Sequence, residues 1–170
     1  MIREAAVQDS GRIAEIEVES SRYAYQGIVS DECLYRDLSV ENRVPVYEGW
    51  IGGKKFDLYV YEDSAPVLQG MMGIGMCGDE DKTEAFELHF LYVDPGCVRK
   101  GIGSEMLLFF EEKAGEKGCG EYVIWVLEEN RNARNFYEKH GYRPDGKEKI
   151  FRRWNKREIR YVKTPAGEKI

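Results

Sequence analysis

The sequence predicts an α/β fold, an α+β mixed sheet of about seven strands with about four helices. The main evidence is the order strand, loop, helix, strand in the middle of the chain. Residues 86–93 are apolar and aromatic like a strand, a helical pattern begins after Gly101, and residues 121–126 again resemble a strand. Two strands joined by a helix form a βαβ unit, so these two strands are expected to be parallel.

The first part of the chain predicts one short strand and two helices. Residues 2–5 form the strand, and residues 8–24 place apolar side chains at roughly helical spacing, with Asp9 or Ser10 as the cap. Gly27 is a natural stop for this helix. A second helix is expected from Ser30 to about Leu38, because Leu34 and Leu38 are one turn apart.

Two further strands are expected before residue 78. The segment 39–55 contains Pro45 and several glycines, which break both the helix and the strand period, so it is predicted to be an irregular connection. A strand at 56–61, a turn at 62–66 and a strand at 67–77 follow. The last strand contains three glycines, which often mark a bulge or a close approach of another chain segment: Gly70, Gly73 and Gly75.

The remainder of the chain completes the sheet. A polar loop at 78–83 leads into the strand at 86–93, and the helix after Gly101 stops near Gly118. Its apolar positions recur every four residues and predict a core face of Ile102, Met106, Phe110 and Ala114. After the strand at 121–126, a helix is expected at 132–140 and a hairpin of two strands at 142–150 and 159–162. The whole chain, 1–170, is predicted to be a single domain.

Composition excludes several classes of protein. The chain has 170 residues, 42% hydrophobic and 33% charged, which is ordinary for a soluble globular domain. The net charge of −6 argues against nucleic acid as the main partner and is compatible with a cationic amine substrate. No apolar run approaches the roughly 18 residues of a membrane span, and the N-terminus lacks a signal-peptide core. We therefore expect a cytoplasmic protein without a membrane partner.

The cysteines argue against a metal centre and a redox motif. There are four, and none lies close to another in sequence: Cys33, Cys77, Cys97 and Cys119. Zinc sites and redox motifs normally need close pairs of cysteines. Reduced thiols in a cytoplasmic protein without a metal cofactor are the simplest account.

The segment 93–104 is a candidate phosphate site. It carries the chain from a strand into a helix N-terminus, where backbone N–H groups lack intrahelical partners and the helix dipole is positive. Gly101 and Gly103 space the loop, and Arg99 and Lys100 add positive charge. The segment lacks the Gly-Lys-Ser/Thr ending of a P-loop and the third glycine of a dinucleotide-binding loop, so it fits neither of these nucleotide motifs.

The loop does fit a third pattern. Residues 98–103, Val-Arg-Lys-Gly-Ile-Gly, resemble the Gln/Arg-x-x-Gly-x-Gly/Ala pyrophosphate loop of the GNAT superfamily of N-acetyltransferases. Residues 91–95 are similar to the family's fourth strand and its exit, and residues 125–142 to its fifth strand and fourth helix. The Gln/Arg position is Val98, so a side-chain contact to phosphate from that position is missing and weaker cofactor affinity is expected.

The resemblance implies a fold and a cosubstrate. In this family the fourth and fifth strands splay apart, and the pantetheine arm of acetyl-CoA lies in the gap and pairs with the fourth strand. The residues expected to bind the cofactor are therefore the strand residues Leu91, Tyr92 and Val93, the loop residues Val98, Arg99, Lys100, Gly101, Ile102, Gly103 and Ser104, and the motif asparagine Asn130. A backbone N–H around 91–93 would stabilise the thioester oxygen. Asn130 also reads as a helix N-cap, and both roles can hold together.

Acetyl transfer to an amine needs a proton acceptor for the amine and a proton donor for the leaving thiolate. The resemblance places Tyr137 in the position of the general acid, and a phenol with an ordinary pKa near 10 keeps its proton at neutral pH. Glu87 precedes Gly101 at the place where histone-type members carry a glutamate base. His89 lies two residues on, hence on the same face of the strand, and could share that task. An exposed carboxylate and a structural histidine are the alternatives for this pair.

Other candidates are less specific. Arg131 and Arg134 could reach the 3′-phosphate of the cofactor or lie in solvent, and His140 at a helix C-terminus is expected to be structural. In the family the acceptor enters over the first two helices and strands two to four. The aromatic residues that would then line its path, unless they belong to the core, are Tyr23, Tyr25, Trp50, Tyr59 and Tyr61.

These expectations together indicate a cytoplasmic, acetyl-CoA-dependent N-acetyltransferase. The acceptor would be a primary amine of a small molecule or a protein, attacked directly without a covalent enzyme intermediate, by a monomer or homodimer. One alternative is an acyl-CoA-binding or sensing domain of the same fold with little or no catalysis, which Val98 favours. A second alternative is an interaction domain that binds no cofactor.

Overall fold

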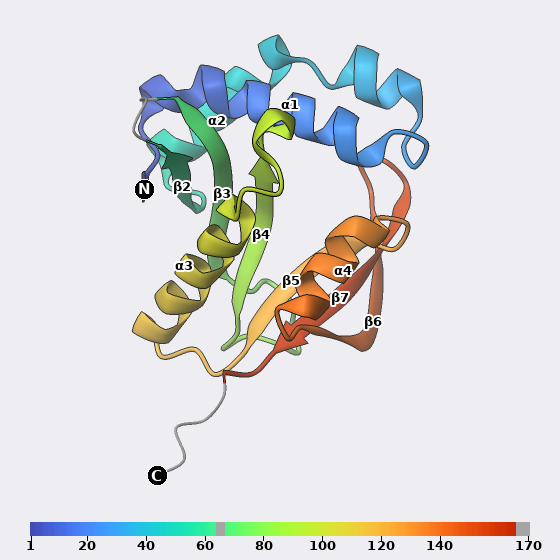
Figure 1. The fold of residues 1–170 in the computed structure, drawn as a ribbon. Coiled ribbons are helices and arrows are strands. Elements are labelled where there is room, and N and C mark those ends of the chain that lie inside the picture. Colours follow the sequence, from blue (N-terminus) through green and yellow to red (C-terminus); the bar gives the residue numbers. More distant parts are fainter. Residues whose placement is uncertain (64–66, 166–170) are drawn as a thin grey trace. The chain divides into compact units, whose positions relative to one another are not determined.

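The computed structural model describes residues 1–63 and 67–165 of the chain, and its seven strands form one mixed sheet (Figure 1). The strand order is β1-β2-β3-β4-β5-β7-β6. The bounds are β1 Ile2–Glu4, β2 Asp57–Glu62, β3 Leu68–Met76, β4 Phe86–Val93, β5 Tyr122–Leu127, β6 Arg143–Phe151 and β7 Lys156–Lys163. Strand β4 pairs with β5 in parallel over residues 86–88 and 122–124, as the βαβ pattern predicts. The predicted C-terminal hairpin is also confirmed, since β6 and β7 are antiparallel.

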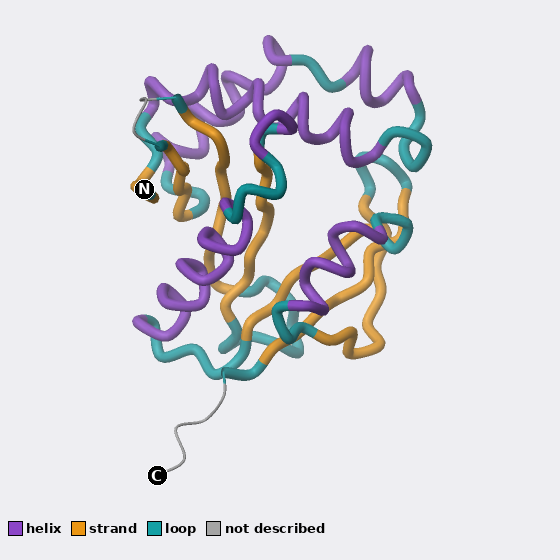
Figure 2. Tube along the Cα trace, in the orientation of Figure 1, coloured by secondary structure: helices purple, strands orange, loops and turns teal. Residues whose placement is uncertain are grey.

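Over the described residues, four α-helices and three short helical turns accompany the sheet. They are η1 Val7–Asp9, α1 Ser10–Tyr25, η2 Glu32–Asp37, α2 Val40–Gly53, η3 Pro95–Cys97, α3 Ile102–Glu116 and α4 Arg131–Lys139. Figure 2 shows these helices and the loops between them. The predicted helix at 30–38 is one π-helical turn, and the predicted core face of α3 is buried at Ile102, Met106, Phe110 and Ala114. The predicted turn at 62–66 lies partly outside the described residues.

The backbone contacts divide the chain into two compact units. The first contains residues 1–74 and 90–109, and the second contains residues 75–89 and 110–170. Strands β3 and β4 and helix α3 each contribute residues to both units. The expected opening between the fourth and fifth strands concerns the placement of one unit against the other and stays a prediction.

In the first unit, helices α1 and α2 pack on one face of β2 and β3, and the start of α3 packs on the other. The core under α1 and α2 consists of Ile13, Ala14, Ile16, Tyr47, Leu58, Val60, Leu68 and Met71. On the opposite face, Gly70 lets α3 approach the strand, because a Cβ there would lie 2.9 Å from the sulfur of Met106. A Cβ at Gly73 would lie 2.3 Å from the Phe90 ring. The predicted close approaches along β3 are therefore confirmed.

The prediction of an irregular segment at 39–55 is wrong, because residues 40–53 form helix α2 with Pro45 inside it. The Ser39 side chain caps the helix by accepting a hydrogen bond from the Asn42 N–H. Tyr47 is buried to 1% exposure, and its ring makes an edge contact with Trp50. Packing of this aromatic face against the core outweighs the low helix propensity of proline and glycine.

In the second unit, α4 lies over β5 and β7 (Figure 1), where Arg134 donates to the Tyr161 hydroxyl and Tyr161 donates to Glu138. The opposite face of β7 carries Arg160, which is only 2% exposed. Its guanidinium donates to carboxylates from the loop between β3 and β4 and from β6, at Asp79, Asp81 and Asp145. This network fixes the segment between β3 and β4 onto the C-terminal hairpin.

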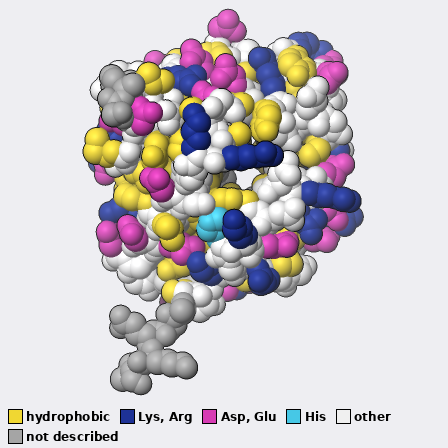
Figure 3. All heavy atoms as spheres, viewed as in Figure 1, with side chains coloured by type: hydrophobic (Ala, Val, Ile, Leu, Met, Phe, Trp, Pro, Cys, Tyr) yellow, Lys and Arg dark blue, Asp and Glu magenta, His cyan; other side chains and the backbone are white. Residues whose placement is uncertain are grey.

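None of the described helices has both the length and the apolar character needed to cross a lipid bilayer. On the face drawn in Figure 3, basic and acidic side chains both reach the surface. The four cysteines are free thiols, two of them buried, at Cys77 and Cys119. Within residues 1–63 and 67–165 no group of three or more potential metal-binding side chains comes together.

Candidate active site

The exit of β4 is held in place by helix α1. The Ser20 hydroxyl donates to the carbonyl of Val93 over 2.8 Å, and Arg12 forms an ion pair with Asp94. The Asp94 carboxylate in turn accepts the N–H of Gly96 and starts the short turn η3, which Pro95 also favours. These contacts position the predicted cofactor strand residues Leu91, Tyr92 and Val93 and the start of the loop.

The loop from Val98 to Gly101 adopts an unusual backbone conformation. Arg99 has φ of 63° and Gly101 has φ of 89°, both in the left-handed region. Glycine adopts this region readily, but arginine does so at a cost, and such strain is common at functional sites. The two conformations turn the chain from β4 into α3, as the glycine spacing predicts (Figure 2).

Helix α3 begins at Ile102, and its first intrahelical bond runs from the Glu105 N–H to the Gly101 carbonyl. The N–H groups of Ile102, Gly103 and Ser104 therefore precede the intrahelical ladder at the positive end of the helix dipole. Arg99 and Lys100 are exposed beside them, and half-buried Val98 offers no polar side chain. The local geometry has the donors that a pyrophosphate needs, and these donors are backbone groups.

Glu87, the carboxylate on β4, is buried to 9% exposure, yet it is well partnered. Its Oε1 lies 3.1 Å from Nδ1 of His89, and the thiol of Cys77 donates a hydrogen bond to it. Burial alone would raise the pKa of Glu87, but the His89 contact, the nearby Lys149 ammonium and the Cys77 thiol together hold that pKa below its usual range. Glu87 is therefore a carboxylate at neutral pH.

Two further groups interact with Glu87. Burial raises the pKa of the Cys77 thiol to about 12, so this thiol stays protonated and serves as a donor. Glu158 on β7 pairs in register with Lys149 on β6, and its pKa is raised by burial and by Glu87 while Lys149 opposes the shift. Sequence reasoning missed Cys77 as a partner of Glu87, because Cys77 follows β3 whereas Glu87 lies on β4.

Tyr137 lies on α4 and is 8% exposed. Its ring makes edge contacts with Phe136 and Tyr142. Asn130 is also 8% exposed, and its Oδ1 accepts the N–H of Ala133 over 3.1 Å. The expected helix cap is thus confirmed. The side-chain amide nitrogen of Asn130 is the group that could contact a cofactor.

The predicted site residues belong to both units. Residues 91–93 and 98–104 lie in the first, whereas Glu87, Asn130 and Tyr137 lie in the second. Their roles and their convergence on one cofactor stay predictions.

Several weaker candidates have structural partners. Arg134 donates to the Tyr161 hydroxyl and to the Glu128 carbonyl, and Nδ1 of His140 lies 2.8 Å from the Phe136 carbonyl, so His140 is structural as expected. Tyr59 contacts Phe109 of α3, and Tyr61 interacts with Glu105 of the same helix. Both tyrosines thus face α3 rather than α1 and α2, which argues against their expected place along the acceptor path.

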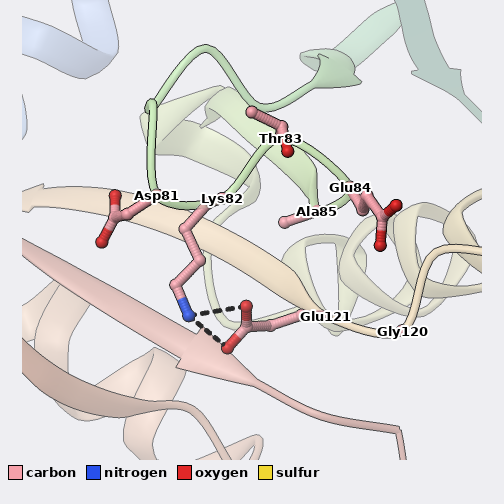
Figure 4. Close-up of a pocket in the computed structure, with 7 residues that line it drawn as sticks. All are labelled: Asp81, Lys82, Thr83, Glu84, Ala85, Gly120 and Glu121. Carbon is pink, nitrogen blue, oxygen red and sulfur yellow. Dashed lines mark hydrogen bonds and ion pairs between the residues drawn. The ribbon is translucent and has the colours of Figure 1, made fainter.

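A hollow of about 290 Å³ lies in the second unit, at the start of β4 and β5. It is lined by residues 81–85 with Gly120 and Glu121, and Figure 4 shows the Lys82 ammonium pointing at both oxygens of Glu121. Because this ion pair occupies the lysine and Glu121, we do not assign the hollow a ligand.

Comparison with known proteins identifies the family. The model of the acetyltransferase (GNAT) family matches residues 22–142, which is most of the chain. The chain belongs to the GNAT family. It is similar to the uncharacterized N-acetyltransferase YuaI of Bacillus subtilis, with 25% identity over 129 residues, 76% of this chain and 72% of that protein.

Solved structures share the GNAT fold. The PaiA N-acetyltransferase of Thermoplasma acidophilum, solved with coenzyme A, has a TM-score of 0.76 at 22% identity, over 94% of this chain and 96% of that one. The acetyltransferase yncA of Salmonella typhimurium, described as putative and solved with acetyl-CoA, has a TM-score of 0.68 at 20% identity, over 100% of this chain and 96% of that one. At these identities the likeness establishes the fold, and the expected GNAT architecture is confirmed.

Proposed function

We propose that this GNAT protein transfers the acetyl group of acetyl-CoA to a primary amine of a small molecule or a protein. The observation that carries the proposal is the strained loop at 98–101, which leads directly into the N-terminus of α3. Coenzyme A or acetyl-CoA is bound in two structures of the same fold. A cytoplasmic site of action stays a prediction from the sequence.

In the proposed reaction, the α3 N-terminus and residues 98–104 bind the pyrophosphate, and the backbone of 91–93 holds the pantetheine arm and the thioester oxygen. The acceptor amine loses a proton to the Glu87–His89 pair and its nitrogen attacks the thioester carbon. The new C–N bond replaces the C–S bond, and the leaving thiolate takes a proton from Tyr137. Every atom is accounted for without a covalent enzyme intermediate.

The test combines binding with turnover. Isothermal titration with acetyl-CoA measures affinity, and release of the CoA thiol is followed with polyamines, aminoglycosides, amino acids and peptides with free N-termini. We expect binding, together with thiol release for one class of amine. Binding without release for any amine would support the sensing alternative, and no binding at millimolar acetyl-CoA would support an interaction domain.

A separate pair of variants tests whether the loop binds the pyrophosphate of acetyl-CoA. Val98→Arg restores the charged residue of the family pattern and should tighten acetyl-CoA binding, because it adds a charge-assisted contact to phosphate. Val98→Leu is the matched control, which keeps the side chain apolar. Equal affinities for the two variants would argue against pyrophosphate at this loop.

A further inference from the structure

Lys149 holds its ammonium over an aromatic ring. The residue lies on β6, and its Nζ is 4.0 Å from the centroid of the Trp125 ring on β5. An indole face attracts a cation through its quadrupole. Lys147, two residues earlier on the same strand, instead has its ammonium 3.9 Å from a carboxylate oxygen of Asp81. The surroundings of the Lys149 amine thus differ from those of its neighbour on the strand.

The ring under the Lys149 ammonium is connected to Glu87 by two contacts. Trp125 packs against the small core cluster that contains Cys77. The Cys77 thiol in turn donates a hydrogen bond to Glu87. All four residues lie within the second unit. One aromatic ring and one thiol therefore join a primary amine of the chain to the carboxylate that takes the amine proton in the proposed reaction.

The Lys149 ammonium also interacts with two carboxylates. Glu158 on β7 is its partner in the strand register. Burial raises the pKa of Glu158, and Lys149 opposes that shift. At Glu87 burial has the same direction, and Lys149 adds to the His89 contact in lowering the pKa. Because such interactions weaken with distance, the amine lies in the vicinity of both acids.

The Lys149 side chain is exposed and lines a hollow of about 320 Å³. Trp125 and Arg160 also line this hollow, and the rest of its lining is charged: Asp79, Glu80, Asp81, Lys147 and Glu148. A lysine carries its amine on a flexible four-carbon stem. The Lys149 amine can therefore leave the ring and change position near Glu87 without any movement of the strand.

We propose that Lys149 is a self-acetylation site, and that the chain transfers the acetyl group of acetyl-CoA to Nζ of its own Lys149. This inference rests on the proposed acetyltransferase function and names a protein amine that the same site modifies. An exposed lysine that lies near Glu87 needs no binding step to present its amine, because the chain already holds it there.

The step uses the groups of the proposed reaction. The ammonium first gives one proton to the Glu87–His89 pair, which passes it to solvent. The amine nitrogen then attacks the thioester carbon, and a second N–H proton goes to the same pair. The C–N bond forms as the C–S bond breaks, and the leaving thiolate takes a proton from Tyr137, which recovers one from solvent. The products are an uncharged acetyl-lysine, CoA with a free thiol and one proton.

The test needs only the full chain and acetyl-CoA, without an added amine. Mass spectrometry of the digested protein should find an acetyl group on Lys149, together with a matching release of CoA thiol. Lys149→Arg keeps the positive charge but has no primary amine, so it should abolish this release. Lys147→Arg is the matched control on the same strand and should leave the acetylation of Lys149 unchanged. Loss of the modification in Lys147→Arg alone would overturn the inference.

Two further measurements separate catalysis by the chain from unassisted chemistry. Glu87→Gln should slow the acetylation of Lys149 by about 10²-fold, as for loss of a general base, and its thermal melt shows whether it folds. An equal rate in the wild type and Glu87→Gln would mean that acetyl-CoA modifies an exposed lysine without catalysis. The rate per chain should not change on dilution. A rate that rises with protein concentration would mean transfer between chains and would contradict the proposal.

The amine panel distinguishes failure of this inference from failure of the proposed function. If the wild type releases no thiol with any amine and gains no acetyl group, the proposed function fails and the inference fails with it. Thiol release with an amine of the panel, while Lys149 stays unmodified after long incubation with acetyl-CoA, would overturn the inference alone.

Discussion

Tyr137 is the residue on which the proposed chemistry depends most directly. Tyr137→Phe removes only the phenol proton donor, and the ring contacts with Phe136 and Tyr142 remain. We expect kcat to fall by about 10-fold or more, as for loss of a general acid, with acetyl-CoA affinity nearly unchanged in a titration. Tyr35→Phe, at a 52% exposed position, is the control and should behave as wild type. Unchanged turnover in Tyr137→Phe would make this tyrosine a core residue.

Arg160 is a second residue with a large expected effect, here on stability. It is buried and pairs with three carboxylates, so Arg160→Met leaves these acids without their shared partner. We expect the free energy of unfolding at pH 7 to fall by about 2–4 kcal/mol. Arg36→Met removes an exposed ion pair and should change little.

The same substitution has a defined pH dependence. The hydrogen bond from Arg160 holds the pKa of Asp81 below its usual value of 3.8. Burial would raise the pKa of Asp145, but the hydrogen bonds from Arg160 and from the Lys147 N–H outweigh burial and lower it. The stabilisation that these lowered pKa values provide is fully present above about pH 4. It is lost as the pH falls through the pKa values of the two carboxyls in the folded state. The difference between wild type and Arg160→Met in urea unfolding should therefore shrink as the pH falls below about 4. A constant difference would contradict the assignment.

Among the elements, glycine is expected to stabilise β3, where it allows close packing, and to destabilise α2, where it lowers helix propensity. At Gly73 a Cβ would collide with the Phe90 ring, so Gly73→Ala should destabilise the fold by about 1–3 kcal/mol. Gly49 lies inside α2 with nothing within 4 Å, so Gly49→Ala should stabilise it by about 0.5–1 kcal/mol through helix propensity. Urea unfolding measures both variants. Similar effects at the two positions would show that the β3 glycines are not needed for close packing.

The same two elements show how far sequence reasoning reaches. The strands and the βαβ unit could be predicted, because apolar runs and their period are local properties of the chain. Helix α2 could not, because Pro45 and its glycines disfavour a helix locally and only burial of Tyr47 against α1 and the sheet compensates. A prediction from a short stretch of sequence does not include such tertiary packing.

The candidate site was also only partly predictable from the sequence. The loop at 98–104 was predictable from glycine spacing between a strand and a helix, a local signal. The partners of Glu87 were only half predictable. His89 lies two residues away on the same strand, but the Cys77 thiol comes from the neighbouring segment after β3. The apolar sequence pattern that ends at Cys77 does not indicate a contact with Glu87.

At the scale of the whole molecule, the division into two units raises the question of whether the chain unfolds in one step. Strands β3 and β4 and helix α3 pass from one unit into the other, so unfolding either unit breaks elements that both units share. We therefore expect one cooperative transition, as for a single domain. Trp50 lies in the first unit, and the other two tryptophans, Trp125 and Trp154, lie in the second.

A variant with Trp125→Phe and Trp154→Phe leaves Trp50 as the sole fluorescent reporter of the first unit. Its urea unfolding curve should coincide with that from far-UV circular dichroism, which follows both units. The comparison is made within one protein, so any loss of stability from the two substitutions affects both curves equally. Separate midpoints would mean that the units unfold independently. In that case the loop at 98–104 and the Glu87–His89 pair would belong to separately stable parts, and cofactor binding would have to bring them together.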